Sequence, residues 1–157
     1  MQDWRITLAW DGRRFCGWQR QPNVVTIQQV VEESLAAVLG GASVTVTASG
    51  RTDAGVHALA QVASFQTDVP RSPVAIRNGL NFHLPPEIVC LDASHAPPDF
   101  NARAWSRSKL YRYRILAHPV RCPFRDGKVW HIKKKLDVRA MAEAVKPLEG
   151  AHDFSSF

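Results

Sequence analysis

The sequence predicts an α+β fold in which helices pack on one antiparallel sheet. Three patterns indicate this class: polar and apolar residues alternate as in strands, two segments have helical spacing between helix-ending signals, and the two kinds of segment follow one another regularly. Their order is strand, helix, strand, strand, helix, strand. We therefore expect residues 1–98 to form one domain.

The first strand and the first helix have clear boundaries. Residues 4–10 alternate as a strand does, and a turn-forming Asp-Gly pair follows them. Thr26 and Gln29 have the spacing of a capping box, and apolar residues then recur at helical spacing as far as a Gly-Gly pair. A strand over 4–10 and a helix over 27–39 are predicted.

Four further segments complete the first domain. Residues 44–48 and 59–65 have the composition of strands. A Ser-Pro pair suited to the N-cap and first turn opens a short helix over 73–80, and residues 88–91 form a last strand. This order is that of the ferredoxin-like, or split β-α-β, fold, which leaves one face of its antiparallel sheet free of helices.

Residues 99–157 repeat the beginning of this pattern. A strand over 109–117 and a helix over 137–148 correspond to the opening β-α of the first domain. A strand and a helix without further strands would leave a sheet edge unpaired. We expect these residues to be the incomplete start of a second, similar domain, with more chain normally following.

The composition is that of an ordinary soluble protein, and we expect it to be cytoplasmic, without a membrane span or signal peptide. The cysteines Cys16, Cys90 and Cys122 are far apart, and the six histidines are scattered singly. Zinc requires about four clustered ligands. We therefore expect no metal site.

The positive charge is concentrated in the last third of the chain. Residues 1–99 hold 7 Lys and Arg against 9 Asp and Glu, a net charge of −2, whereas residues 100–157 hold 13 against 5, a net charge of +8. Such a basic segment suits a polyanion, because lysine and arginine neutralise phosphates. A solvated basic face without a partner explains the charge equally well.

The loop at residues 50–57, with the sequence GRTDAGVH, offers a candidate for chemistry. Asp53 is a lone carboxylate between two glycines, and a carboxylate can act as a covalent nucleophile or a general base. Arg51 lies two residues away and could keep it ionised. Alternatively, Asp53 is a turn residue whose side chain binds its own backbone.

Residues 109–115 form a second candidate. Strand alternation would place Tyr111 and Tyr113 on one face and Arg112 and Arg114 on the other. Aromatic side chains stack on bases, and arginines contact phosphates. The alternative is a half-buried strand whose tyrosines pack inside and whose arginines are solvated.

Five segments in order resemble the signatures of the tRNA pseudouridine synthase A (TruA) family, from the first strand to the last residue. They are the Asp-Gly pair with FCGWQRQ at residues 11–21, GRTDAGVH at 50–57, DFNAR at 99–103, KLYRY at 109–113 and GAHDFSSF at 150–157. The resemblance implies an enzyme of the pseudouridine synthase fold. Such an enzyme isomerises uridine to pseudouridine on the 3′ side of the tRNA anticodon stem-loop, without metal or cofactor.

The same resemblance implies roles for individual residues. Asp53 matches the catalytic aspartate, Arg51 the arginine that orients it or holds the target nucleotide, and Tyr111 the tyrosine that stacks on the base. A base must leave the stack to reach a carboxylate, and an aromatic wall offsets part of that cost. Four residues are expected to contact the tRNA: Arg20, Arg103, Lys133 and Lys134.

The family further implies a homodimer and a longer chain, so these 157 residues alone are expected to be inactive and to expose apolar surface.

Two other functions are compatible with the residues. One is a noncatalytic RNA-binding module of ferredoxin-like fold, although residues 109–115 lack the RNP1 pattern of such modules. The other is an interaction protein with a basic face, which would leave the loop at 50–57 without a purpose.

Overall fold

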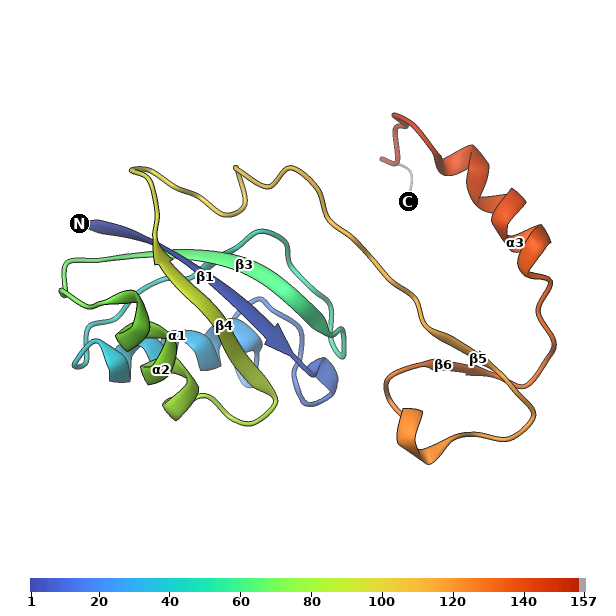
Figure 1. The fold of residues 1–157 in the computed structure, drawn as a ribbon, viewed down its shortest axis with the longest axis horizontal. Helices are drawn as coiled ribbons and strands as arrows, with labels where there is room; N and C mark the ends of the chain where they lie inside the picture. The colour runs from blue at the N-terminus through green and yellow to red at the C-terminus, as the bar shows by residue number, and fades with distance from the viewer. Residues whose placement is uncertain (156–157) are drawn as a thin grey trace. The chain divides into compact units, whose positions relative to one another are not determined.

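The structure is a computed structural model that describes residues 1–155. Ser156 and Phe157, which end the GAHDFSSF segment, lie outside the described residues. The chain forms two compact units, Met1–Lys109 and Leu110–Phe157, and each is described by itself (Figure 1). The predicted α+β class is confirmed in the first unit, which contains one antiparallel sheet and two α-helices.

The first unit alternates strands and helices in the expected order. Its strands pair antiparallel in the order β2-β3-β1-β4, so that β1 and β3 are central. A short 3₁₀ helix at Gly12–Arg14 follows the first strand. The elements are β1 (Gln2–Trp10), α1 (Ile27–Val38), β2 (Thr47–Ala48), β3 (Ala58–Thr67), α2 (Pro73–His83) and β4 (Ile88–His95).

The core lies between one face of the sheet and the two helices, as Figure 1 shows. Trp4, Ile6 and Leu8 alternate along β1 toward this face and are at most 1% exposed. Leu35 from α1 and Leu80 from α2 are fully buried in the same cluster. Burying each such side chain contributes about 1.5–3 kcal/mol, so the core fixes the helices on this face.

The second strand is shorter than the predicted 44–48, because side chains of α1 bind the backbone before it. The Val46 amide donates to Glu32 Oε1 over 3.0 Å, and the Val46 carbonyl accepts from Gln28 Nε2 over 3.1 Å. A backbone that is bonded to a helix in this way cannot also join the sheet. Of residues 44–48, only Thr47 and Ala48 pair with β3.

The first unit extends beyond residue 98, where the sequence placed the domain boundary. The Asp99 amide donates to Asp3 Oδ2 over 3.1 Å, and the Ala102 amide donates to Ser64 Oγ, also over 3.1 Å. Ala102 is 2% exposed. These contacts hold the segment after β4 on the sheet, so that this compact unit ends at Lys109.

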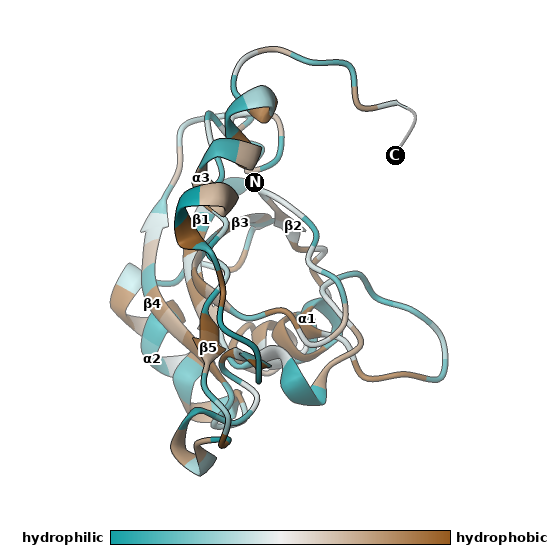
Figure 2. Cartoon of the chain, turned by 90° about the vertical axis from the view of Figure 1, so that its right-hand side faces the viewer, coloured by the Kyte–Doolittle hydropathy of each residue, from teal (hydrophilic) through white to brown (hydrophobic). Residues whose placement is uncertain are grey.

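The second unit contains two short strands that pair in parallel, followed by a helix. Its elements are β5 (Ile115–Ala117), a 3₁₀ turn (Pro123–Arg125), β6 (Trp130–Ile132), α3 (Val138–Val145) and a final 3₁₀ turn (Lys146–Leu148). Asp137 caps α3 by accepting from the Ala140 amide over 3.0 Å, which agrees with the predicted start of the helix. Figure 2 shows that α3 is largely apolar, with hydrophilic residues between the hydrophobic ones.

The predicted strand over 109–117 is wrong for residues 109–114, which have no regular secondary structure. A strand requires a neighbour that binds its backbone, and β6 pairs only with residues 115–117. Tyr111 and Tyr113 are 69% and 87% exposed. The expected division of this segment into an aromatic face and an arginine face therefore does not apply to it.

None of the described residues from 110 to 155 is buried. Large apolar side chains in this unit are exposed instead, including Trp130 at 64%, Phe124 at 90% and Val138 at 72%. A unit without buried apolar residues lacks the main driving force of folding. Within residues 1–155, no helix is long and apolar enough to cross a membrane.

Gln28 connects α1 to the segments on both sides of it, and its removal tests this part of the fold. Its Oε1 accepts from the Arg20 amide over 2.9 Å, and its Nε2 donates to the Val46 carbonyl. Because Gln28 is buried, Gln28→Leu leaves these groups without partners and should lower the free energy of unfolding in urea by ~2–4 kcal/mol. Gln29→Leu is the control, since Gln29 bonds to Glu33 at the surface. Equal losses in both variants would contradict the role of Gln28.

Candidate active site

The loop that carries Asp53 joins β2 to β3 and makes a turn held by backbone bonds. The Ser49 amide donates to the Val62 carbonyl over 2.8 Å, which closes the base of the loop. At its tip, the Val56 amide donates to the Asp53 carbonyl over 3.2 Å. Gly55 has φ +79°, a conformation that other residues rarely adopt. The glycine in the GRTDAGVH motif thus permits the turn that follows Asp53.

This loop is docked on the segment that follows β1. The Trp18 amide donates to the Thr52 carbonyl over 2.9 Å, and the Gly55 amide donates to the Phe15 carbonyl over 3.3 Å. The Trp10 indole donates to the Val56 carbonyl over 3.0 Å. Two segments that are far apart in the sequence are therefore joined on both sides of Asp53.

Two glycines make this docking possible. A Cβ on Gly12 would lie 2.1 Å from the Val56 carbonyl oxygen, and a Cβ on Gly17 would lie 2.6 Å from the Thr52 carbonyl oxygen. Gly17 also has φ +79°. Because both distances are far shorter than a van der Waals contact, only glycine permits the two backbones to approach so closely.

The docked loop exposes the side chains of Asp53 and Arg51 to solvent. Within residues 1–155, neither side chain has a hydrogen bond or an ion pair. The structure therefore shows no Asx turn at Asp53, since the bond that closes the turn goes to its backbone carbonyl. Among the residues described, it also shows no ion pair between Arg51 and Asp53.

Asp11 and His57 lie at the base of the docked loop. Asp11 accepts from Arg13 Nη2 over 2.7 Å and from the Arg13 amide over 3.2 Å. The hydrogen bonds from Arg13 lower the pKa of Asp11 to about 2. The Gly12 amide donates to His57 Nδ1 over 3.3 Å. Asp11 thus carries a negative charge close to the point where the loop meets β1.

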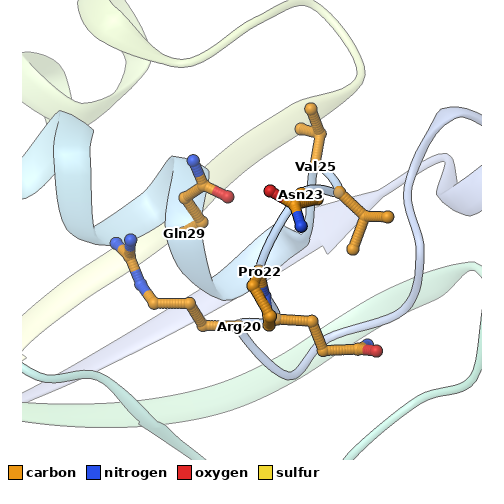
Figure 3. Close-up of a pocket in the computed structure, with 7 residues that line it drawn as sticks. Arg20, Pro22, Asn23, Val25 and Gln29 are labelled. Atoms are coloured by element: carbon orange, nitrogen blue, oxygen red, sulfur yellow. The ribbon is translucent and has the colours of Figure 1, made fainter.

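Arg20 lies in the segment before α1, where it is bound to the helix. Its Nε lies 2.9 Å from Glu32 Oε2. Beside it is a pocket of about 630 Å³, shown in Figure 3, whose labelled residues are Arg20, Pro22, Asn23, Val25 and Gln29. Because Glu32 balances part of its charge, Arg20 attracts an anion less strongly than an unpaired arginine does.

The remaining predicted residues fall into both units. Arg103 is exposed, and its amide donates to Asn101 Oδ1 over 3.0 Å in a turn of the first unit. Tyr111, Lys133 and Lys134 are exposed residues of the second unit, which is described separately from the Asp53 loop. The structure therefore brings Asp53 and Arg51 together in one loop and places Arg20 and Arg103 in the same unit.

The sequence did not identify the residues that hold the loop, namely Trp10, Gly12, Gly17 and His57, as parts of a site. Gly12 and Gly17 were noticed only as members of motifs. A glycine that follows a strand is compatible with many turns, so its contact with a distant loop has no local signal. Among the described residues, no group of three or more His, Cys, Asp or Glu side chains could hold a metal.

Gly12→Ala should displace the Asp53 loop. The added Cβ overlaps the Val56 carbonyl, so we expect a loss of ~1–3 kcal/mol in the free energy of unfolding and faster hydrogen exchange at the Trp18 amide. Gly50→Ala is a matched control, because a Cβ there meets only the flexible end of the Lys109 side chain, at 2.8 Å. Unchanged exchange in Gly12→Ala would show that the close approach does not hold the loop.

The pKa of Asp11 can be measured by NMR titration of its carboxyl carbon. We expect a value of about 2 and, in Arg13→Met, a return toward the ordinary value, since Arg13 is its main cause. The folded-state pKa lies below the unfolded one, so this contribution to stability is present above pH ~4 and is lost as the pH falls toward 2. An ordinary pKa in the unsubstituted protein would contradict the Asp11–Arg13 contact.

Comparison with known proteins places this site in a family. The family model of tRNA pseudouridine synthase matches residues 7–103, which include the Asp53 loop and the segment on which it docks. The tRNA pseudouridine synthase A of Syntrophotalea carbinolica is 47% identical over 153 residues, which cover 98% of this chain and 60% of that protein. That of Geotalea daltonii is 45% identical over 157 residues, which cover 100% and 64%.

A third relative, the tRNA pseudouridine synthase A of Myxococcus xanthus, is 46% identical over 153 residues and is covered over 57% of its length. The chain thus spans about 60% of the length of the curated relatives it matches. The match of the family model covers more than half of the chain. With that match and these identities, the chain belongs to the tRNA pseudouridine synthase family.

Proposed function

We propose that this chain is the part of a tRNA pseudouridine synthase that carries the catalytic carboxylate. The reaction breaks the N1–C1′ bond of a uridine on the 3′ side of the anticodon stem-loop and rejoins the base through C5. Asp53 is its catalytic residue. The observation that carries this proposal is the presentation of an exposed, unpaired carboxylate by a loop whose backbone is fixed on both sides of it.

The proposed chemistry requires such a presentation. A nucleophile or base gains most when it is held in place while its reacting atoms stay accessible. A target uridine must leave its stacked position to reach Asp53, and Arg51 is exposed in the same loop to hold it. We assign Tyr111 the role of stacking on the flipped base.

The tRNA backbone is the proposed partner of the basic residues. Lys133 and Lys134 are exposed in the second unit, and Arg103 is exposed in the first. Each can contact a phosphate, and together they give binding that weakens with salt. Arg20 contributes less, because Glu32 is its ion-pair partner.

The strand order supports the ferredoxin-like assignment of the first unit. A β-α-β-β-α-β chain with the spatial order β2-β3-β1-β4 and only antiparallel pairs corresponds to the split β-α-β arrangement. We assign the second unit to the start of a similar domain. Its described residues bury no side chain, and the relatives are longer than this chain. The complete protein is proposed to be a cytoplasmic homodimer.

Tritium release from C5-labelled uridine in bulk tRNA tests the activity. A chain extended to the length of its relatives should release tritium, and Asp53→Asn should reduce the rate by ~10³-fold or more. Asp68→Asn is the matched control, since Asp68 follows the opposite end of β3 from the loop and pairs with the amino terminus at 2.8 Å. The 157-residue chain by itself should be inactive, since it spans only about 60% of the length of its relatives.

The results also separate this function from a noncatalytic RNA-binding module, which the exposed Tyr111 and Tyr113 would suit. Retained tRNA binding with lost release in Asp53→Asn supports the enzyme. A folded, extended chain that binds tRNA but releases no tritium would indicate the binding module. Undiminished release by Asp53→Asn would refute the role of Asp53.

A further inference from the structure

Two side chains join the end of the Asp53 loop to the end of β1. The Trp10 indole Nε1 donates to the Val56 carbonyl over 3.0 Å, and the Gly12 amide donates to His57 Nδ1 over 3.3 Å. We call Trp10 and His57 the two-point clamp. One side chain comes from the strand and the other from the loop, so that the two contacts together oppose sliding of the loop along β1.

The strand side of the clamp is rigid. Trp10 is the last residue of β1, is 4% exposed and pairs with the Trp18 ring at a centroid distance of 5.6 Å. The Trp18 amide is itself the donor to the Thr52 carbonyl. A buried ring that is packed in this way cannot follow a moving loop, so its N–H gives the Val56 carbonyl a fixed position.

The Gly12 contact gives His57 Nδ1 its role in the clamp. A backbone amide can only donate, so Nδ1 accepts in this contact. Asp11 Oδ1 also lies 3.3 Å from this nitrogen, and the same carboxylate accepts from Arg13 at 2.9 and 2.7 Å. The direction of the amide contact assigns His57 Nδ1 the role of acceptor from Gly12.

The clamp acts on Asp53 through one backbone bond. The Val56 amide donates to the Asp53 carbonyl over 3.2 Å, so a shift of Val56 shifts Asp53. On the other side, Thr52 is held by Trp18. Asp53 thus lies between two anchored neighbours, although its own side chain has no partner among residues 1–155.

We propose that Trp10 and His57 are positioning residues for catalysis by Asp53. This inference rests on the proposed function. Neither side chain needs to touch the substrate: the clamp fixes the place at which the carboxylate meets the target nucleotide. Misplacing a reacting group by about 1 Å can cost ~10²-fold in rate, so loss of the clamp lowers kcat more than it weakens tRNA binding.

The test uses the chain extended to the length of its relatives, with tritium release measured over a range of tRNA concentrations. His57→Leu removes the acceptor, and His57→Asn retains one, because its Oδ1 occupies the place of Nδ1. We expect kcat to fall by ~10- to 100-fold in His57→Leu and Trp10→Phe, with KM changed by less than about threefold. His57→Asn should recover most of the lost kcat.

His83→Leu is the control for loss of an imidazole, since His83 is an exposed residue at the end of α2. Its kcat should not change. A kcat in His57→Leu equal to that of the unsubstituted chain would overturn the proposal. An equal loss of kcat in His57→Asn and His57→Leu would also overturn it, provided that both variants unfold at the same urea concentration. Inactivity of the unsubstituted chain would instead refute the proposed function. The clamp would then be tested by the rate of hydrogen exchange at the Gly12 amide. Faster exchange in His57→Leu than in His57→Asn supports the clamp, and equal exchange overturns it.

Discussion

The contact between two backbones is the constraint on which the rest of this site depends. Gly12 and Gly17 approach residues 52–56 so closely that a Cβ would overlap carbonyl oxygens. At that distance the hydrogen bonds from Trp10 and Trp18 reach the loop directly. Larger residues would keep the chains apart, and the same loop sequence would then lose the contacts on both sides of Asp53.

The same segment also sets the start of the first helix. The Ile27 amide donates to the Gly17 carbonyl over 3.1 Å, and the Gln28 amide donates to the Trp18 carbonyl over 3.0 Å. These bonds satisfy amides at the helix start, which have no partner within the helix itself. Helix, sheet and loop are thereby joined at Gly17 and Trp18, and the hydrophobic core under α1 supports the site at a distance.

The sequence predicted what depends on local pattern and missed what depends on contacts across the chain. Alternation and caps located α1 and α2, and the motif singled out Asp53 as a candidate. The short β2 could not be predicted, because Glu32 takes the amide of Val46. Residues 109–114 have the composition of a strand, but a strand exists only beside a partner. The clamp through His57 could not be predicted either, since nothing local indicates that its Nδ1 accepts from the amide of Gly12.

Position and charge are supplied separately at Asp53. The backbone contacts and the clamp fix where the carboxylate lies, yet within residues 1–155 no cation pairs with it. Arg51 makes no ion pair with it, and Arg13 pairs with Asp11 instead. An unpaired carboxylate in water is stabilised by solvent, and it gains reactivity when a bound substrate displaces that solvent. The described loop therefore fits a site whose carboxylate becomes reactive only when other groups cover it. In the proposed reaction, the target nucleotide is such a group.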